Sequence, residues 1–389
     1  MSWLLKRLER TVSPRALGVL RITIGITAIL KALDIAPVLA RFDDAATLRI
    51  PYFGGFTIVD VGATPLLAAW IGTAVLFTLG ARTTLAGIAL SIILAGVMLA
   101  DQQLYSNHHY LLLLLVALVT IGRAGSSMSV DAWRCGGSDV VPGWPLDLLR
   151  VQISIVYGFA ALAKLNAVYL SGSVVAAYLR RDGPLAIPGE WRTFEVMAIL
   201  SVLSILTEAF LAIALWLPRW RAAAFIAGLG LHVSIAFLFD PLVQLLIFGL
   251  MILPTYLIFL DTKPRSRAVI WDDSCGFCGR IIGWLKRLDW LHVLDPIPSS
   301  DAATRDALGV TQAEADQAIQ LVFRSDGRRV AGFAAVQRVL QVLPVSFLWA
   351  PILRLPPIMA VGDRAYRRVA ARRSCNISLR PTDAANAQD

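Results

Sequence analysis

Two closely spaced cysteines carry the clearest chemical signal in this 389-residue sequence. Cys275 and Cys278 form a CxxC motif between a short apolar run, residues 268–271, and a helical pattern of apolar residues that starts at Ile281. The first thiol is then expected at a helix N-terminus, where unpaired N–H groups and the helix dipole stabilise a thiolate. The second thiol lies one turn further on and can resolve a mixed disulfide. The motif predicts thiol–disulfide exchange.

Asp272 stands three positions before Cys275 and has two interpretations. It is either a proton-handling group for the thiols, which we favour slightly, or a residue that forms the turn, and its negative charge would oppose a neighbouring thiolate. A zinc site is an alternative use of the cysteines, but this part of the chain adds only the isolated His292 and Cys375. We therefore predict no metal site.

Lys164 is the second chemical feature, because it lies inside the apolar run 151–170. A lysine within a membrane helix costs a few kcal/mol and normally faces a protein interior or a wet cavity. Burial disfavours the charged ammonium, which would make the side chain a usable base. The alternative is that the ammonium reaches the headgroups, since Asn166 and Tyr169 follow closely.

The composition indicates a membrane protein, since 57% of the residues are hydrophobic. No small-residue cleavage site follows the basic start of the chain, so no cleavable signal is expected. The net charge of +9 comes from bases in short loops beside apolar segments, and no nucleic-acid partner is predicted. We expect an α-helical polytopic bundle of about eight spans, at residues 16–37, 64–80, 84–100, 108–121, 146–170, 193–217, 222–239 and 242–260.

Loop charges predict the orientation of these spans. The side that holds both termini receives most of the Lys and Arg residues, which places both termini and everything after the last span in the cytoplasm. Lys164 follows Arg150 by about 21 Å along a helix and is expected in the outer half of the bilayer.

Further polar residues are expected at a similar depth. They are Asn107, His108, His109 and Tyr110 at the start of the fourth span, Glu208 in the sixth and His232 in the seventh. Histidine suits proton relay because its unperturbed pKa lies near 6.5. Taken alone, the segment 107–110 is more often a helix cap with solvated imidazoles, and the sequence does not tell which of the adjacent histidines faces inward.

The membrane part resembles the vitamin K-dependent gamma-carboxylase family and its bacterial relatives, the HTTM domains, over roughly residues 10–260. The resemblance rests on Lys164 within Ala-Lys-Leu-Asn and on the Asn-His-x-Tyr-Leu segment 107–111, and His232 and Glu208 are similar to further family residues. It implies that Lys164 deprotonates a reduced quinone, that the other polar residues bind it, and that a quinone or hydroquinone similar to vitamin K is a cosubstrate. The large luminal portion with which the animal carboxylases engage their protein substrate has no counterpart here, so the resemblance does not imply glutamate carboxylation.

A polar linker at 261–267 leads to a second domain with α/β features. Its strand, CxxC and helix follow in the order of a thioredoxin-like fold. The predicted domains are 1–262, 266–375 and a disordered tail at 376–389. The expected elements are strands at 268–271, 293–297, 319–323 and 329–332, helices at 333–343 and 359–373, a Thr311–Glu314 capping box and an Asp326–Gly327 hairpin.

This second domain resembles the DCC family of predicted thiol-disulfide oxidoreductases over roughly residues 266–375. The resemblance rests on DxxCxxC at 272–278, on Gly332 after the hairpin, on the proline pair 356–357 and on the terminal segment 366–373. Two departures are that Trp271 replaces the usual tyrosine and that no proline precedes the strand at 319, where thioredoxins place a cis-proline.

The leading prediction is a membrane-tethered thiol-disulfide oxidoreductase with a quinone-handling transmembrane domain. Cys275 attacks, Cys278 resolves, and the expected partners are membrane lipids, a quinone, and a thiol or disulfide substrate, either a protein or a small thiol. One alternative is a quinol-dependent epoxidase or carboxylase-like enzyme with Lys164 as base. The other is a non-enzymatic lipid-binding or transport scaffold.

Overall fold

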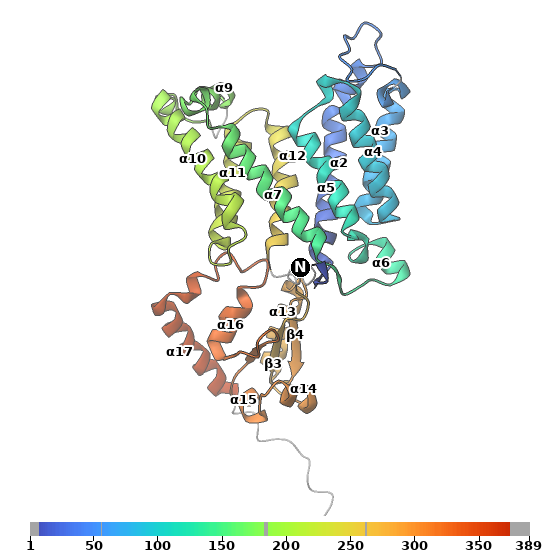
Figure 1. Ribbon diagram of the computed structural model, residues 1–389. Coiled ribbons are helices and arrows are strands. Elements are labelled where there is room, and N and C mark those ends of the chain that lie inside the picture. The colour runs from blue at the N-terminus through green and yellow to red at the C-terminus, as the bar shows by residue number, and fades with distance from the viewer. Residues whose placement is uncertain (1–7, 56, 183–185, 261–262, 374–389) are drawn as a thin grey trace, which may run out of the picture. The chain divides into compact units, whose positions relative to one another are not determined.

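The computed structural model describes residues 8–55, 57–182, 186–260 and 263–373. The chain divides into two compact units, Met1–Thr262 and Lys263–Asp389 (Figure 1). The tail predicted at 376–389 lies outside the described residues.

The first unit is built mainly from helices, with one short ladder between β1 (Thr11–Val12) and β2 (Val141–Pro142). The longer helices are α2 (Arg15–Arg41), α3 (Ala63–Leu79), α4 (Thr83–Ala100), α5 (Asn107–Ile121), α7 (Trp144–Ala163), α10 (Phe194–Ala214), α11 (Arg221–Leu238) and α12 (Leu242–Ile252). Shorter helices are α6 (Val130–Cys135), α8 (Ala167–Leu170) and α9 (Ser173–Tyr178).

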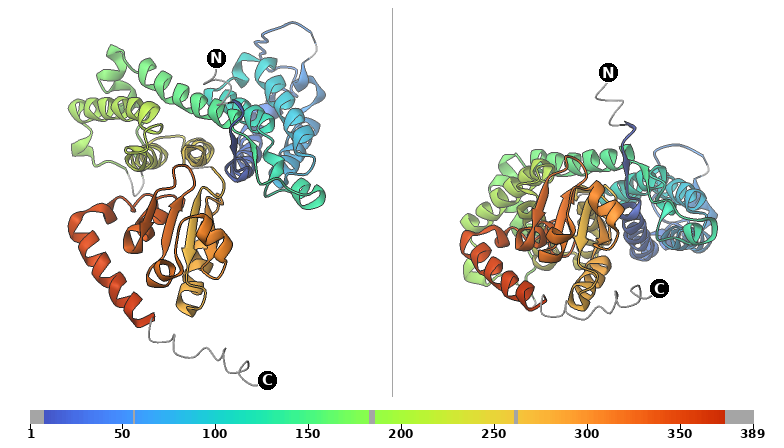
Figure 2. Two further views of the ribbon diagram at one scale, coloured as in Figure 1. Left: turned by 60° about the horizontal axis from the view of Figure 1, so that its bottom comes forward. Right: turned by 90° about the horizontal axis from the view of Figure 1, so that it is seen from below.

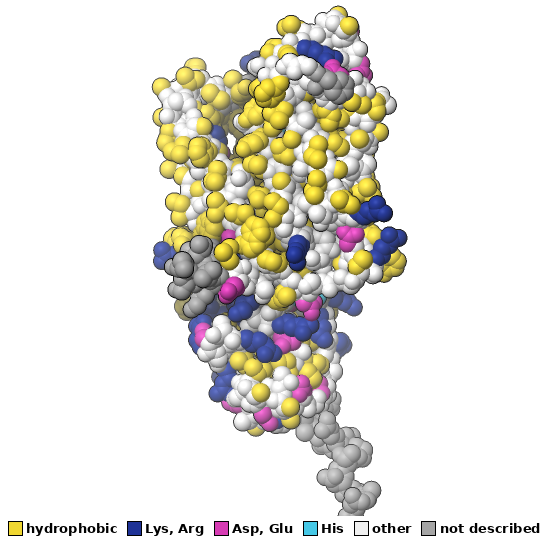
Figure 3. Space-filling model, turned by 45° about the vertical axis from the view of Figure 1, so that its right-hand side comes forward, with side chains coloured by type: hydrophobic (Ala, Val, Ile, Leu, Met, Phe, Trp, Pro, Cys, Tyr) yellow, Lys and Arg dark blue, Asp and Glu magenta, His cyan; other side chains and the backbone are white. Residues whose placement is uncertain are grey.

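Each of the eight predicted spans overlaps one of the longer helices, but these helices differ in length. Among the described residues six helices are long and apolar enough to cross a membrane: α2, α4, α7, α10, α11, and α12 together with the 3-10 turn η5 (Leu253–Phe259) that continues it. The helices α3 and α5 are shorter, with 17 and 15 residues. Many hydrophobic side chains are exposed on the helices of this unit, and Figure 3 shows them spread over one of its faces, as expected for helices in contact with lipid.

The centre of the bundle is α2, which packs against α3, α5 and α12. Its face with Leu17, Leu20 and Ile24 is fully buried. Gly25 lies directly against Thr78 of α3, so no larger side chain fits without movement. Small residues of this kind let membrane helices approach closely, where packing rather than the hydrophobic effect holds them together.

The fifth predicted span, 146–170, is wrong as a continuous helix. The helix α7 ends at Ala163, Lys164 is its C-cap residue, and α8 starts at Ala167. Asn166 is extended, and its side chain accepts a hydrogen bond from the N–H of Tyr169, which is an N-cap that starts a new helix. A lysine at a helix C-terminus also interacts favourably with the helix dipole. Lys164 therefore lies at a helix end and not within a span.

The second unit is an α/β domain with a four-stranded mixed sheet in the order β4–β3–β5–β6. Its strands are β3 (Arg267–Trp271), β4 (Leu294–Pro298), β5 (Gln320–Phe323) and β6 (Arg329–Ala331), of which β3 and β4 are parallel and the other pairs antiparallel. Its helices are α13 (Gly276–Leu288), α14 (Ala302–Ala307), α15 (Gln312–Gln317), α16 (Gly332–Leu340) and α17 (Pro356–Arg373).

Helices cover both faces of this sheet (Figure 2). On one face Val269 and Leu321 of the sheet pack with Ile282 of α13 and Val339 of α16. On the other face Ala268, Ile270 and Val322 pack with Ala315 of α15. Alternate apolar residues of β3 and β5 thus belong to two hydrophobic cores, one on each face of the sheet, since successive side chains of a strand point to opposite faces.

The local signals predicted for this domain are confirmed. Thr311 and Glu314 form the capping box of α15. The turn at Asp326–Gly327 joins the antiparallel strands β5 and β6, with Gly327 at a positive φ of 68°.

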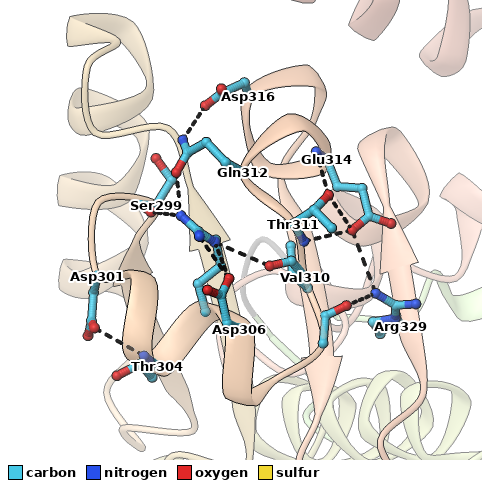
Figure 4. Close-up of polar contacts among 12 residues, drawn as sticks. Ser299, Asp301, Thr304, Asp306, Val310, Thr311, Gln312, Glu314, Asp316 and Arg329 are labelled. Carbon is cyan, nitrogen blue, oxygen red and sulfur yellow. Dashed lines mark hydrogen bonds and ion pairs between the residues drawn. The ribbon is translucent and has the colours of Figure 1, made fainter.

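A buried arginine that the sequence analysis missed holds the loops after β4. Arg305 of α14 donates to the carbonyl oxygens of Ser299, at 2.6 Å, and Val310, at 3.2 Å, and to the side chains of Asp306 and Gln312. Figure 4 shows these four acceptors converging on one guanidinium. Most of its donors are satisfied inside the protein, so the buried charge is compensated.

We expect Arg305→Ala to lower the free energy of unfolding of the second unit by about 3 kcal/mol, because it leaves buried carbonyl oxygens without a donor. The control is Arg324→Ala, which breaks an exposed ion pair with Asp295 and should cost less than about 1 kcal/mol. Pulse proteolysis of the full chain in urea measures both losses. Equal losses would contradict the role of the buried arginine.

Candidate functional sites

The CxxC motif lies where the sequence predicts it, at the start of a helix that follows a buried strand. Cys275 is the N-cap residue of α13 and is partly exposed, and its carbonyl accepts a hydrogen bond from the N–H of Gly279 at 3.0 Å. Cys278 lies one turn further on and is buried, with 8% exposure. Cys275 is thus accessible to a substrate, whereas Cys278 is buried.

Asp272 forms the turn that leads into the motif. Its Oδ1 atom accepts hydrogen bonds from the backbone N–H of Ser274 at 3.0 Å and from the Ser274 hydroxyl at 2.6 Å. This buried carboxylate is therefore engaged in an Asx turn, which is the second of the two interpretations that the sequence allows.

Asp273, which the sequence analysis did not single out, ties the CxxC loop to the end of β4. Its Oδ1 atom accepts hydrogen bonds from the Ser299 hydroxyl at 3.0 Å and the Ser300 N–H at 3.1 Å. Burial would raise the pKa of Asp273, but the hydrogen bonds from Ser300 and Ser299 outweigh it and lower the pKa below its usual value. Arg305 holds Ser299 in turn, so a chain of contacts runs from α14 to the loop before Cys275.

The residue before β5 uses a hydrogen bond that a proline would not allow. The backbone N–H of Ile319 donates to the Tyr366 hydroxyl of α17 at 2.9 Å. The absence of a proline before this strand, noted in the sequence, therefore goes together with a contact between α17 and the start of the strand. Of the two isolated residues considered as zinc ligands, Cys375 lies outside the described residues.

In the first unit Lys164 and Glu208 form an ion pair between the end of α7 and the middle of α10. The Lys164 side chain is 23% exposed and the Glu208 side chain 7%. The Lys164 ammonium also lies 5.6 Å from the centre of the Tyr169 ring. Within the described part of the chain the second oxygen of Glu208, Oε2, is buried without a hydrogen-bond partner.

A cavity of about 510 Å³ is lined in part by Lys164. Its wall is mainly apolar, with Leu200, Leu231 and Leu245 among its residues, and its polar groups include His108 and Lys164. An apolar cavity with a few placed polar groups fits a largely hydrophobic small molecule with a polar head.

The adjacent histidines have different surroundings. His108 lines the cavity, and its ring stacks on Phe248 at 4.4 Å between centroids. His109 is fully buried on another side of α5, where Nε2 lies 3.0 Å from the carbonyl oxygen of Leu94 and the ring contacts Trp70. The structure thus brings His108, and not His109, to the cavity.

The other two residues of that segment do not line the cavity. Asn107 accepts a hydrogen bond from the Tyr105 hydroxyl at 3.0 Å, and Tyr110 is 45% exposed. These two residues belong to the local structure at the start of α5.

His232 belongs to a buried hydrogen-bonded group with two tyrosines, and of these three residues the sequence analysis singled out His232 alone. Its Nε2 atom lies 2.7 Å from the Tyr157 hydroxyl, which lies 2.5 Å from the Tyr256 hydroxyl. The ring of His232 also packs in an edge-type arrangement with the ring of Phe248, the residue on which His108 stacks. Spacing could have revealed Tyr157, because it precedes Lys164 by two helical turns on the same face of α7.

We expect His109→Ala to destabilise the protein by on the order of 2–4 kcal/mol, because it opens a cavity against Trp70. His108→Ala should cost less than half as much, since its ring already borders open space. Thermal unfolding of both variants in lipid nanodiscs compares them, and a larger loss for His108→Ala would contradict this assignment.

A dithiol at a helix start, on an α/β unit joined to an apolar helical bundle, is the architecture of a membrane-associated oxidoreductase. Two family models match the chain: the HTTM domain over residues 9–263 and the DCC1-like thiol-disulfide oxidoreductase over residues 269–375. The first match spans more than half of the chain, so this protein belongs to the HTTM family and carries a DCC1-like thiol-disulfide oxidoreductase domain. Both resemblances read from the sequence are confirmed. No curated protein and no solved structure matches the chain.

Proposed function

We propose that the protein exchanges thiols and disulfides through Cys275 and Cys278, on a thioredoxin-like domain tethered to the membrane. The observation that carries this proposal is the partly exposed Cys275 at the N-terminus of α13 with the buried Cys278 one turn behind it. The parallel pair β3–β4 around α13 and the antiparallel pair β5–β6 followed by α16 support the thioredoxin-like assignment.

The reaction proceeds in two balanced steps. The Cys275 thiolate attacks a substrate disulfide, which forms a mixed disulfide and releases one substrate sulfur as a thiolate that takes up a proton. The Cys278 thiolate then attacks the Cys275 sulfur, which closes the Cys275–Cys278 disulfide and releases the second substrate thiol. Two electrons pass to the substrate, and another dithiol must return them for another cycle.

The charge distribution of the loops supports both termini and the thiol domain in the cytoplasm, with α3 and α5 completing eight spans. A reporter fused after Lys263 should give a cytoplasmic signal. A signal from the opposite side would overturn this topology.

We expect Cys275→Ser to abolish disulfide reductase activity, because the attacking sulfur is lost. Cys278→Ser should retain the first step and accumulate the mixed disulfide, which mass spectrometry of the intact protein detects. The matched control is Cys135→Ser, which removes an exposed thiol of the first unit and should leave the rate unchanged. Full activity of Cys275→Ser would eliminate the proposal.

A second function, quinone handling by the membrane domain, is favoured by the cavity that Lys164 and His108 line. In this proposal a quinone or hydroquinone occupies the cavity, and the neutral amine form of Lys164 takes a proton from the hydroquinone and becomes the ammonium that pairs with Glu208. Epoxidation or carboxylation of an acceptor is a later step. Glu208 compensates the charged form of the lysine. If the membrane domain has no quinone chemistry, the non-enzymatic alternative applies, in which the mainly apolar cavity holds a lipid for binding or transport. Mass spectrometry of copurifying lipids separates these cases.

The two functions are coupled if the dithiol reduces the quinone. That reaction passes two electrons and two protons from Cys275 and Cys278 to the quinone and leaves a disulfide and a quinol. We expect quinol formation from the reduced protein to be lost in Cys275→Ser and kept in Lys164→Ala, which should block only a later base-dependent product. Absorbance of the added quinone follows the reaction, and equal quinol yields in Cys275→Ser and wild type would separate the two domains.

A further inference from the structure

The helix that carries the redox motif has an exposed apolar stripe. Phe277, Ile281 and Trp284 of α13 follow each other at helical spacing, so they share one side of the helix. Their exposed fractions are 45%, 41% and 62%. The opposite side of α13 is occupied, since Ile282 packs into the core of the sheet. The stripe is therefore additional to what α13 needs for folding.

The charge of α13 is entirely positive. The helix contains Arg280, Lys286 and Arg287 and no acidic residue. The Arg287 guanidinium lies 5.7 Å from the centre of the Trp284 ring, so a basic group borders the stripe directly. Tryptophan and leucine-like residues on one side, with Lys and Arg beside them, are the composition of helices that lie in a membrane interface.

A second exposed apolar set belongs to the same domain. Val345, Trp349 and Ile352 follow α16 and are 42%, 61% and 54% exposed. The helices α13 and α16 pack on the same face of the sheet, and this set follows α16 in the chain.

The chain itself keeps this domain within reach of a bilayer. The turn η5 ends at Phe259 and β3 begins at Arg267. The seven residues between them span at most about 24 Å when fully extended. A surface with apolar and basic residues at this distance from a membrane segment meets lipid at high effective concentration.

We propose that the stripe Phe277, Ile281 and Trp284 binds the surface of an anionic lipid bilayer, with Arg280 and Arg287 against the lipid headgroups. The attachment sets Cys275, two residues before Phe277, at the membrane interface. Substrates that are themselves dissolved in or anchored to the membrane then reach the attacking thiol without leaving the lipid.

Photo-crosslinking of the full chain in nanodiscs of phosphatidylglycerol and phosphatidylcholine tests this attachment. The photoreactive residue p-benzoylphenylalanine replaces Trp284 or Ile281, and the matched control replaces Lys286, which lies on another side of the same helix. A second control is Ala313 of α15, which covers the opposite face of the sheet. We expect at least about tenfold more lipid adduct at positions 284 and 281 than at either control, decreasing with added salt.

Equal lipid adducts at all four positions would overturn the proposal, because the tether alone would then explain the contact. Adducts to protein in place of lipid would also overturn it and would identify the occupant of the stripe as the membrane domain or a second copy of the chain. All four replaced side chains are exposed, so folding is expected to be preserved.

Discussion

A charged group in an apolar bundle must be neutralised, and in this protein the Lys164–Glu208 ion pair meets that requirement. The pair joins the end of α7 to the middle of α10. Removing either partner would leave an uncompensated buried charge, which costs several kcal/mol. The contact links two helices that pack closely on each other, at the end of α7 and beside the cavity that Lys164 lines.

The α/β domain solves a different problem, which is to hold a loop with a reactive thiol in one conformation. Two carboxylates and one guanidinium group hold this loop. Asp272 closes the turn, Asp273 joins the turn to the residues after β4, and Arg305 binds the carbonyl oxygen of Ser299 among those residues. None of the three has to meet a substrate. Their hydrogen bonds position Cys275 at the start of α13.

Much of this organisation follows from local patterns in the sequence. Runs of apolar residues locate the eight longer helices of the first unit, and the order strand, CxxC, helix locates the redox motif, because these signals depend on neighbours along the chain. The end of α7 at Ala163 was missed, since the apolar pattern continues through it and the cap at Asn166 acts against that pattern. The partners of Glu208 and Arg305, and the side of α5 on which His108 lies, depend on contacts between distant segments. A single sequence holds no direct record of such contacts.

The unequal exposure of the two thiols fixes the kinetic order of the proposed exchange. A partner collides with the sulfur of Cys275, so capture is second order and depends on how much partner is present. Release depends on Cys278, which is one turn away in the same helix, so it is first order. This internal release therefore does not depend on the concentration of the partner, although its rate depends on the thiol that leaves.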